Sequence, residues 1–263
     1  MKDNVVLFAQ WLLALKHFRR SPRYYSPIAS GARRSTAFVQ RLKWLFAQLL
    51  LGFLLSSVLL VAGLRFLSPP TSAFMLHTHI DDLVAAKTYR AIDQRWVDAT
   101  HISKYASLAV VASEDQLFYQ HFGFDMDAIY RAYDRYQRGG KLRGASTISQ
   151  QVAKNLFLSP ARNLGRKVFE VWFTLLIEIL WSKQRILEMY LNIAEFGDHL
   201  YGIEAASQHF FKLPAKQLSA PQAALLAATL PNPRLLRADR PSAFLGRRQQ
   251  WILGQMRHLS PAS

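Results

Sequence analysis

Several side chains that could transfer a proton lie close together in the middle of the chain. They are Glu114 and Asp115, followed by His121, Gly123 and Asp125. An apolar run at residues 108–113 precedes them and is expected to be buried. A carboxylate at the end of a buried element can be held in a cleft and used as a general acid or base. A plain helix end followed by a turn would explain this stretch equally well if it stood alone.

A second group of polar side chains combines amides with cations. Gln151, Lys154 and Asn155 are spaced i, i+3 and i+4, so they share one face of a predicted helix that starts near Ser146. Two amides and an ammonium beside a helix N-terminus suit an anion such as a phosphate. A solvated helix face would show the same pattern.

A third group follows within residues 166–197. Arg166 and Glu170 lie one helical turn apart, which by itself indicates an ordinary surface ion pair worth about 0.2–0.5 kcal/mol. Glu188 and Asn192 lie among apolar residues, and we expect them to tie helix ends together rather than to react.

Charge and cysteine content narrow the class of protein. The formal net charge is +16, and residues 1–43 alone hold nine basic side chains and one acidic one. A basic protein favours polyanionic partners such as nucleic acid, anionic lipid headgroups or phosphorylated ligands. The chain has no cysteine, which excludes disulfides, thiolate metal sites and cysteine nucleophiles.

One segment is predicted to cross a membrane. Residues 44–64 carry no charged side chain, and at about 1.5 Å per residue they span roughly 30 Å, the thickness of a bilayer's hydrocarbon core. Basic residues are more numerous before this segment than after it. The positive-inside rule therefore predicts a cytoplasmic N-terminus and an external remainder. A buried core helix is the alternative.

The elements that must position these groups are predicted to be helical. Capping boxes at Thr147 with Gln150 and at Ser219 with Gln222 predict two helix starts. Further helices are expected over 164–181, 183–195 and from Gly202 to Phe211. Within 164–181 we expect a buried apolar stripe at positions 164, 168, 171, 172, 175, 176 and 179.

Taken together, the polar groups form five short motifs in one order. Glu-Asp-x-x-Phe-x-x-His-x-Gly runs from Glu114 to Gly123 and includes Phe118, and Gly-x-Ser-Thr-Ile-x-Gln-Gln-x-x-Lys-Asn runs over 144–155. Arg-Lys-x-x-Glu is found at 166–170, Ile-Leu-Glu-x-Tyr-Leu-Asn at 186–192, and Gly-Ile-x-Ala-Ala-x-x-x-Phe at 202–210. This set resembles the peptidoglycan glycosyltransferases, glycosyltransferase family 51, over about residues 70–255. The absence of Ser-x-x-Lys points to the monofunctional branch.

The resemblance implies an all-α, lysozyme-like, two-lobed glycosyltransferase domain preceded by a single transmembrane helix. The expected divisions are a basic cytoplasmic tail over 1–43, the transmembrane helix over 44–64 and a periplasmic domain over 65–263, in a bacterial inner membrane. The implied activity is inverting polymerisation of lipid II into β-1,4 glycan strands, with release of undecaprenyl pyrophosphate.

The resemblance also implies roles for individual residues. Glu114 would be the general base, and Glu170 would orient the pyrophosphate or hold a metal. The expected substrate-binding residues are Ser146, Gln151, Lys154, Asn155, Arg166 and Lys167, and the expected structural ones are Asp115, Phe118, His121 and Gly123. A divalent cation, Mg²⁺ or Mn²⁺, is left open.

The expected partners are lipid II, the nascent glycan strand and the membrane, with no nucleic acid, while cell-wall synthesis or division proteins are left open. Two alternative functions stand beside polymerisation. A lysozyme-like lytic enzyme would also use a catalytic Glu in a helical cleft, but cleavage of neutral sugar does not need Lys154 and Arg166. A non-catalytic scaffold for wall synthesis would not need both Glu114 and Glu170.

Overall fold

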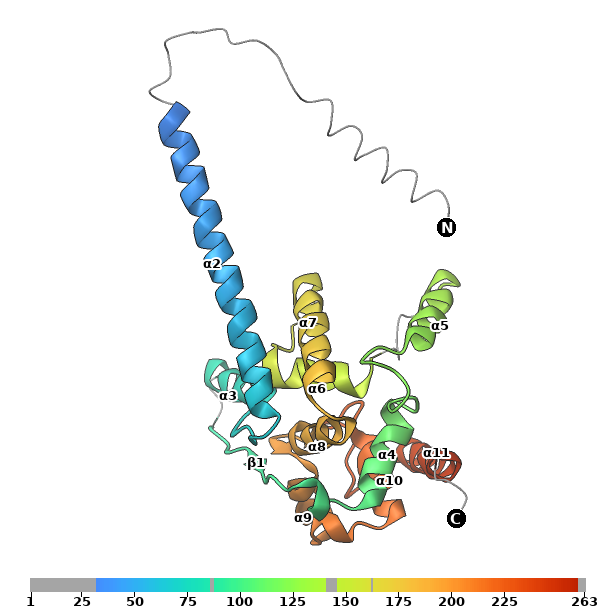
Figure 1. The fold of residues 1–263 in the computed structure, drawn as a ribbon. Coiled ribbons are helices and arrows are strands. Elements are labelled where there is room, and N and C mark those ends of the chain that lie inside the picture. Colours follow the sequence, from blue (N-terminus) through green and yellow to red (C-terminus); the bar gives the residue numbers. More distant parts are fainter. Residues whose placement is uncertain (1–31, 86–87, 141–145, 162, 260–263) are drawn as a thin grey trace. The chain divides into compact units, whose positions relative to one another are not determined.

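The computed structural model describes residues 32–85, 88–140, 146–161 and 163–259 (Figure 1). Most of the predicted basic tail, and Gly144 at the start of the second motif, lie outside the described residues. The chain divides into two compact units, Met1–Leu54 and Leu55–Ser263. The five motifs all fall in the second unit.

The described chain is mostly helical, which confirms the expected fold class. The helices are α2 (Ala32–Leu64), α3 (Ala73–Val84), α4 (Lys104–Glu114), α5 (Met126–Gln137), α6 (Ile148–Phe157), α7 (Leu164–Leu180), α8 (Lys183–Ile193), α9 (Ile203–Phe211), α10 (Ala220–Thr229) and α11 (Ala243–Leu259). Two 3-10 turns, η2 (Ala99–His101) and η3 (Ala215–Gln217), and three short strands, β1 (Asp93–Gln94), β2 (Glu195–Gly197) and β3 (Leu200–Tyr201), complete the order.

Helix α2 contains an apolar stretch that is long enough to cross a membrane. This stretch runs over Phe38–Leu64, 27 residues, and so begins six residues before the predicted segment at 44. Large apolar side chains such as Leu49 and Leu59 are exposed along it. A helix of this composition is consistent with a single-pass membrane anchor.

Within the second unit, the helices pack in two groups. In one group α10 packs against both α4 and α11, and α11 also packs against α4. In the other group α6 packs against α7 and α8. Figure 1 shows the C-terminal end of α4 turned toward the region of α6. The apolar residues buried between these helices form one core cluster.

The last turns of α2 belong to the second unit and are held there by indole groups. Trp181 Nε1 donates to the backbone oxygen of Val61 over 2.7 Å, and Trp172 Nε1 donates to Ser57 Oγ over 3.1 Å. The Arg185 guanidinium reaches the backbone oxygens of Leu64 and Leu67. These contacts fix the end of α2 against α7 and α8.

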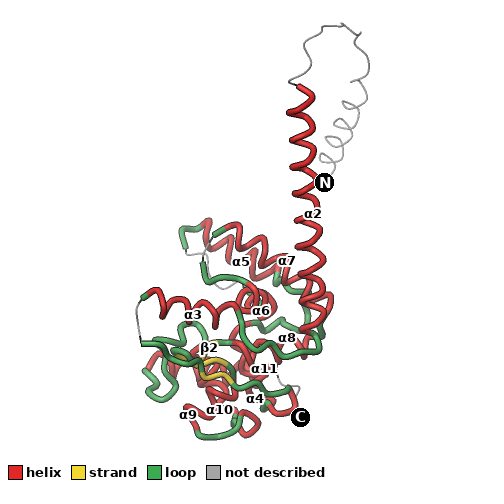
Figure 2. The backbone as a smooth tube through the Cα atoms, turned by 90° about the vertical axis from the view of Figure 1, so that its left-hand side faces the viewer, coloured by secondary structure: helices red, strands yellow, loops and turns green. Residues whose placement is uncertain are grey.

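A small sheet was not predicted from the sequence. It has the order β1-β3-β2, with β1 parallel to β3 and β2 antiparallel to it, and Figure 2 shows β2 among the helices. Strands of two or three residues are too short to show an alternating pattern. Gly202, which follows β3, has φ +84°, and an added Cβ would lie 2.8 Å from the backbone oxygen of Asn192. Only glycine fits this turn without strain.

The predicted helix starts are confirmed. Thr147 accepts from Gln150 N, and the Gln150 side chain accepts from Thr147 N, so the capping box of α6 is complete. The Gln222 side chain likewise accepts from Ser219 N at the start of α10. The segments expected over 183–195 and 202–211 form α8 and α9.

The predicted buried stripe of α7 is wrong at most of its positions. Leu164, Val168 and Ile179 are 87%, 69% and 65% exposed, and only Leu176 of the predicted stripe is buried. The buried face carries Glu170, Phe173, Thr174, Ile177 and Glu178 beside it. Three of these buried residues are polar, and each has a hydrogen-bond partner inside the protein. A pattern of apolar residues alone therefore selects the opposite face of this helix.

Candidate active site

The Glu114 carboxylate ends α4 and lies at the meeting point of several elements. Buried residues of the apolar run, among them Val110 and Val111, anchor the helix that carries it. Gln151 Nε2 of α6 donates to Glu114 Oε2 over 3.0 Å, and Ser113 Oγ donates to Oε1 over 3.3 Å. The side chain keeps 15% of its surface exposed. It is therefore held in place yet open to a ligand.

Gln151 is itself oriented by Tyr190 of α8. The Tyr190 hydroxyl donates to Gln151 Oε1 over 3.2 Å, which leaves the amide nitrogen to face Glu114. Burial raises the pKa of the Tyr190 hydroxyl well above 10.0, and the Glu114 carboxylate raises it further. The phenol thus stays protonated and remains a donor. Tyr190, Gln151 and Glu114 form a chain in which each side chain orients the next.

Cationic side chains surround a neighbouring cavity. It has a volume of about 310 Å³, and its lining includes Phe74, Ser146, Gln150, Gln151, Lys154, Arg166, Lys167 and Glu170. Five of the predicted substrate-binding residues thus come together here, with Glu170. Three cations around one carboxylate leave the cavity with a surplus of positive charge. This surplus suits a ligand that carries more than one negative charge.

Lys154 is partly buried beside the other cations. Burial lowers the pKa of its ammonium below the ordinary value of 10.5, and the nearby Arg166 and Lys167 lower it further. Glu170 and Glu114 oppose this effect. The ammonium also lies 5.3 Å from the centre of the Phe74 ring. A negatively charged ligand beside Lys154 would stabilise the protonated ammonium, which burial and the neighbouring cations disfavour.

Glu170 is fully engaged by its neighbours. Its side chain is buried, its Oε2 accepts from Arg166 over 2.6 Å, and its Oε1 accepts from Lys167. Among the residues that the structure describes, no three His, Cys, Asp or Glu side chains cluster as metal ligands. With both oxygens held by cations, Glu170 does not fit the role of a metal ligand in this arrangement.

A second cavity lies on the other side of Ser146. It has a volume of about 370 Å³ and is lined by Glu114, Asp115, Gln116, Leu117, Asp125, Ala128, Arg131, Ser146 and Thr147. Ser146 lines both cavities, and Gln151 of the first is hydrogen-bonded to Glu114 of the second. The carboxylate and the cations therefore face adjoining spaces.

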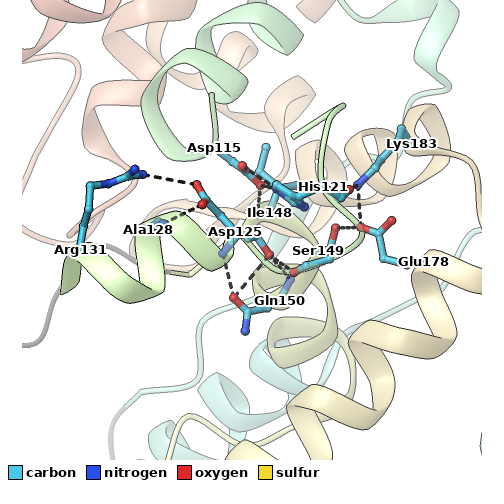
Figure 3. A network of polar contacts seen from close by, with 12 residues as sticks. Asp115, His121, Asp125, Ala128, Arg131, Ile148, Ser149, Gln150, Glu178 and Lys183 are labelled. Carbon is cyan, nitrogen blue, oxygen red and sulfur yellow. Dashed lines mark hydrogen bonds and ion pairs between the residues drawn. The ribbon is translucent and has the colours of Figure 1, made fainter. Parts of the chain in front are cut away.

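A buried polar network braces the loop after Glu114 (Figure 3). Both oxygens of Asp115 lie within 3.0 Å of His121 Nε2, and Asp115 Oδ2 also accepts from Ile148 N at the start of α6. Glu178 accepts from Ser149 and from Lys183, whose ammonium also reaches the His121 backbone oxygen. These bonds join α4, α6, α7 and α8 around the loop that follows Glu114.

The other predicted site residues have less direct positions. Phe118 is fully buried under the Lys183 ammonium, which lies 4.6 Å from its ring centre. Asn155 is half-buried but is not among the residues that line the cationic cavity. Asn192 is fully buried and exchanges hydrogen bonds with the backbone of Val97. It ties α8 to the segment before η2, in keeping with the structural part expected of it.

One residue at the site was missed from the sequence. The Arg248 guanidinium of α11 lies 3.5 Å from Glu114 Oε1, although Arg248 belongs to none of the five motifs. A signal was present, because Arg248 shares a helix face with Leu245, Ile252 and Met256, which are buried. A cation within an apolar stripe requires a partner.

Comparisons with known proteins show which family the chain belongs to. Residues 81–257 match the model of the family described as Transglycosylase, a stretch that includes Glu114 and Glu170. A biosynthetic peptidoglycan transglycosylase of Pasteurella multocida is 51% identical over 219 residues, covering 83% of this chain and 87% of that protein. The chain belongs to the transglycosylase family. It is a peptidoglycan glycosyltransferase, which polymerises glycan strands from lipid II.

Two further relatives extend this similarity to other bacteria. A biosynthetic peptidoglycan transglycosylase of Xanthomonas euvesicatoria is 50% identical and covers 83% of this chain and 88% of its own length. The biosynthetic peptidoglycan transglycosylase of Ectopseudomonas mendocina is 48% identical, and the match covers 81% of this chain and 87% of that protein. The transglycosylase match includes α11 up to residue 257, and so includes Arg248.

Proposed function

We propose that this glycosyltransferase joins two lipid II units with Glu114 as the general base. In the proposed step, the Glu114 carboxylate accepts the proton of the GlcNAc 4-hydroxyl of the acceptor. The acceptor oxygen then forms a bond to the anomeric carbon of the donor, and the bond from that carbon to the pyrophosphate breaks. Attack from the opposite side inverts the anomeric centre. A positioned base of this kind contributes about 10²–10⁴-fold to the rate.

The cationic cavity is proposed to hold the leaving group. Undecaprenyl pyrophosphate gains negative charge as the glycosidic bond breaks, and fixed cations stabilise such charge without reorganisation. Lys154, Arg166 and Lys167 supply these cations, and Glu170 holds Arg166 and Lys167 in position. Ser146, where the two cavities adjoin, and Gln151 are placed to hydrogen-bond sugar or phosphate. Asn155 is proposed as a further polar contact from the same helix.

One observation carries this proposal. Gln151 lines the cationic cavity and donates to the Glu114 carboxylate, so the proton acceptor and the cations are linked through one side chain. An enzyme that cleaves neutral glycan needs an acid or base but not a cationic cavity beside it. The arrangement therefore favours synthesis over cleavage.

The proposed location follows from the substrate and the anchor. Lipid II carries a membrane-bound lipid, and α2 is apolar enough to hold the enzyme at the same surface. Basic residues are more numerous before the apolar segment than directly after it. The N-terminus is therefore proposed to be cytoplasmic and the catalytic domain periplasmic. The bacterial inner membrane is the proposed site of action.

A paired substrate assay tests the proposal. The full-length protein in detergent is incubated with labelled lipid II in one reaction and with labelled cell-wall sacculi in another. We expect glycan polymer and undecaprenyl pyrophosphate from lipid II, inhibition by the phosphoglycolipid moenomycin, and no muropeptide release from sacculi. Muropeptide release without consumption of lipid II would favour a lytic enzyme, and no turnover of either substrate would favour a scaffold.

A further inference from the structure

We propose that Arg248 is a positioning residue for the Glu114 carboxylate, and that its positive charge carries this role. The inference rests on the proposed role of Glu114. It gives α11, the last helix of the described chain, a direct part in the sugar-transfer reaction.

The contacts around Glu114 divide between its two oxygens. Gln151 holds Oε2, while the Arg248 terminal nitrogen lies 3.5 Å from Oε1. Both side chains of this ion pair are mostly enclosed, with 24% of Arg248 and 15% of Glu114 exposed. An ion pair at this level of burial is screened less by salt and water than a surface pair. Arg248 and Gln151 thus fix the carboxylate from two sides.

The position of Arg248 within the buried face of α11 is unfavourable for the stability of the protein. The face that holds Leu245, Ile252 and Met256 packs into the core, and Arg248 interrupts its apolar run. Its Nε atom is buried and has no hydrogen-bond partner among the described residues. A guanidinium with an unsatisfied nitrogen is not placed there for stability. The feature that accounts for its position is the carboxylate that it faces.

A residue about two turns further along α11 also contacts the loop after Glu114. Gln255 Oε1 accepts from Gln116 Nε2 over 3.2 Å, and Gln116 Nε2 also reaches the backbone oxygen of Ala112. Helix α11 is therefore joined to the chain directly after Glu114 and also packs against α4, which limits movement of α4 relative to Arg248. A base must lie within hydrogen-bond reach of the proton that it accepts, so fixing its orientation affects the rate of the chemical step.

Two variants of similar side-chain length separate charge from packing. Arg248→Met keeps an unbranched chain in the core but removes the cation, and Arg248→Lys keeps the cation. Both are made in the full-length protein and assayed with labelled lipid II. We expect Arg248→Met to lower kcat by about 10–100-fold with KM changed by less than about twofold, because the base is misplaced while the donor site is intact. Arg248→Lys is expected to recover most of the lost kcat.

Arg247 provides the matched control. It is the same residue type on the same helix, but its side chain lies outside the Glu114 contacts. Arg247→Met is expected to leave kcat and KM unchanged. Thermal unfolding of all three variants checks that each is folded, and Arg248→Gln serves as a second neutral variant if Arg248→Met does not fold.

The proposal is overturned by a normal kcat in Arg248→Met, by an equal loss in Arg248→Lys, or by a change confined to KM. Glu114→Gln in the same assay separates this inference from the role of Glu114. Normal turnover by Glu114→Gln would remove the proposed base. An inactive Glu114→Gln beside a fully active Arg248→Met would remove only the role of Arg248.

Discussion

At the residue scale, the site depends on side chains that orient one another. Tyr190 orients Gln151, Gln151 holds Glu114, and Glu170 holds two of the cations. The sequence motifs predicted most of these residues because their types and spacing are local. Arg248 was missed because it lies 134 positions after Glu114, and only the folded chain joins them.

The lowered pKa of Lys154 leads to a pH prediction. If the protonated ammonium stabilises the leaving pyrophosphate, activity is present below the pKa of Lys154 and is lost as pH rises through it. Because burial lowers this pKa below 10.5, the loss begins at a lower pH than it would for an exposed lysine. Lys154→Arg keeps its charge at high pH. We therefore expect kcat/KM of the Lys154→Arg variant to fall at a higher pH than kcat/KM of the unmodified protein.

The measurement is kcat/KM for lipid II from neutral pH to about pH 10.5, the ordinary pKa of lysine. Lys216→Arg, a substitution at an exposed position in η3, is the control and should leave the profile unchanged. A basic limb that stays in place in Lys154→Arg would show that Lys154 does not set it.

At the element scale, features set by neighbouring residues were predicted from the sequence, whereas features set by contacts between distant residues were not. Capping boxes predicted the starts of α6 and α10, since a cap involves residues three positions apart. The buried face of α7 was predicted wrongly because Glu170, Thr174 and Glu178 find partners on other elements or along the helix. The short sheet escaped prediction because it pairs Asp93 with Leu200 across more than a hundred residues.

The turn at Gly123 gives a prediction about stability. Gly123 has φ +79°, and an added Cβ would lie 2.9 Å from Thr174 Cγ2 and 3.0 Å from Glu178 Cγ. Gly123→Ala should therefore combine backbone strain with a clash and destabilise the protein by about 1–3 kcal/mol. Thermal or denaturant unfolding of the full-length protein in detergent measures the difference.

Gly246→Ala is the matched control for this substitution. Gly246 lies in α11, and an added Cβ would meet nothing within 4 Å. Alanine favours the helix over glycine by about 1 kcal/mol, so Gly246→Ala should be neutral or stabilising. Equal stability of the two variants would show that the turn at Gly123 tolerates a side chain.

At the scale of the whole molecule, composition predicted the apolar anchor, whereas the positive charge left several polyanionic partners open and the family resemblance supplied the substrate. The apolar segment predicted from residue 44 lies within the apolar stretch Phe38–Leu64 of α2. The division into tail, transmembrane helix and external domain stays a prediction, as does the orientation across the membrane. The positive charge of the chain is consistent with a diphosphate substrate and an anionic membrane surface.

The absence of cysteine allows a direct test of orientation. Arg33→Cys and Arg240→Cys each introduce one thiol, on opposite sides of the apolar stretch Phe38–Leu64. In spheroplasts, a membrane-impermeant maleimide should label Arg240→Cys at once and Arg33→Cys only after permeabilisation. The reverse order would place the catalytic domain in the cytoplasm and contradict the proposed location.

The role of Glu114 is tested most sharply by the single-turnover rate of Glu114→Gln with labelled lipid II. Glutamine keeps the size of the side chain and removes its capacity to accept a proton. We predict a loss of about 10²–10⁴-fold in the rate of glycosidic bond formation, with binding of lipid II retained. A rate within about twofold of the unmodified protein would contradict the assignment of Glu114 as the base.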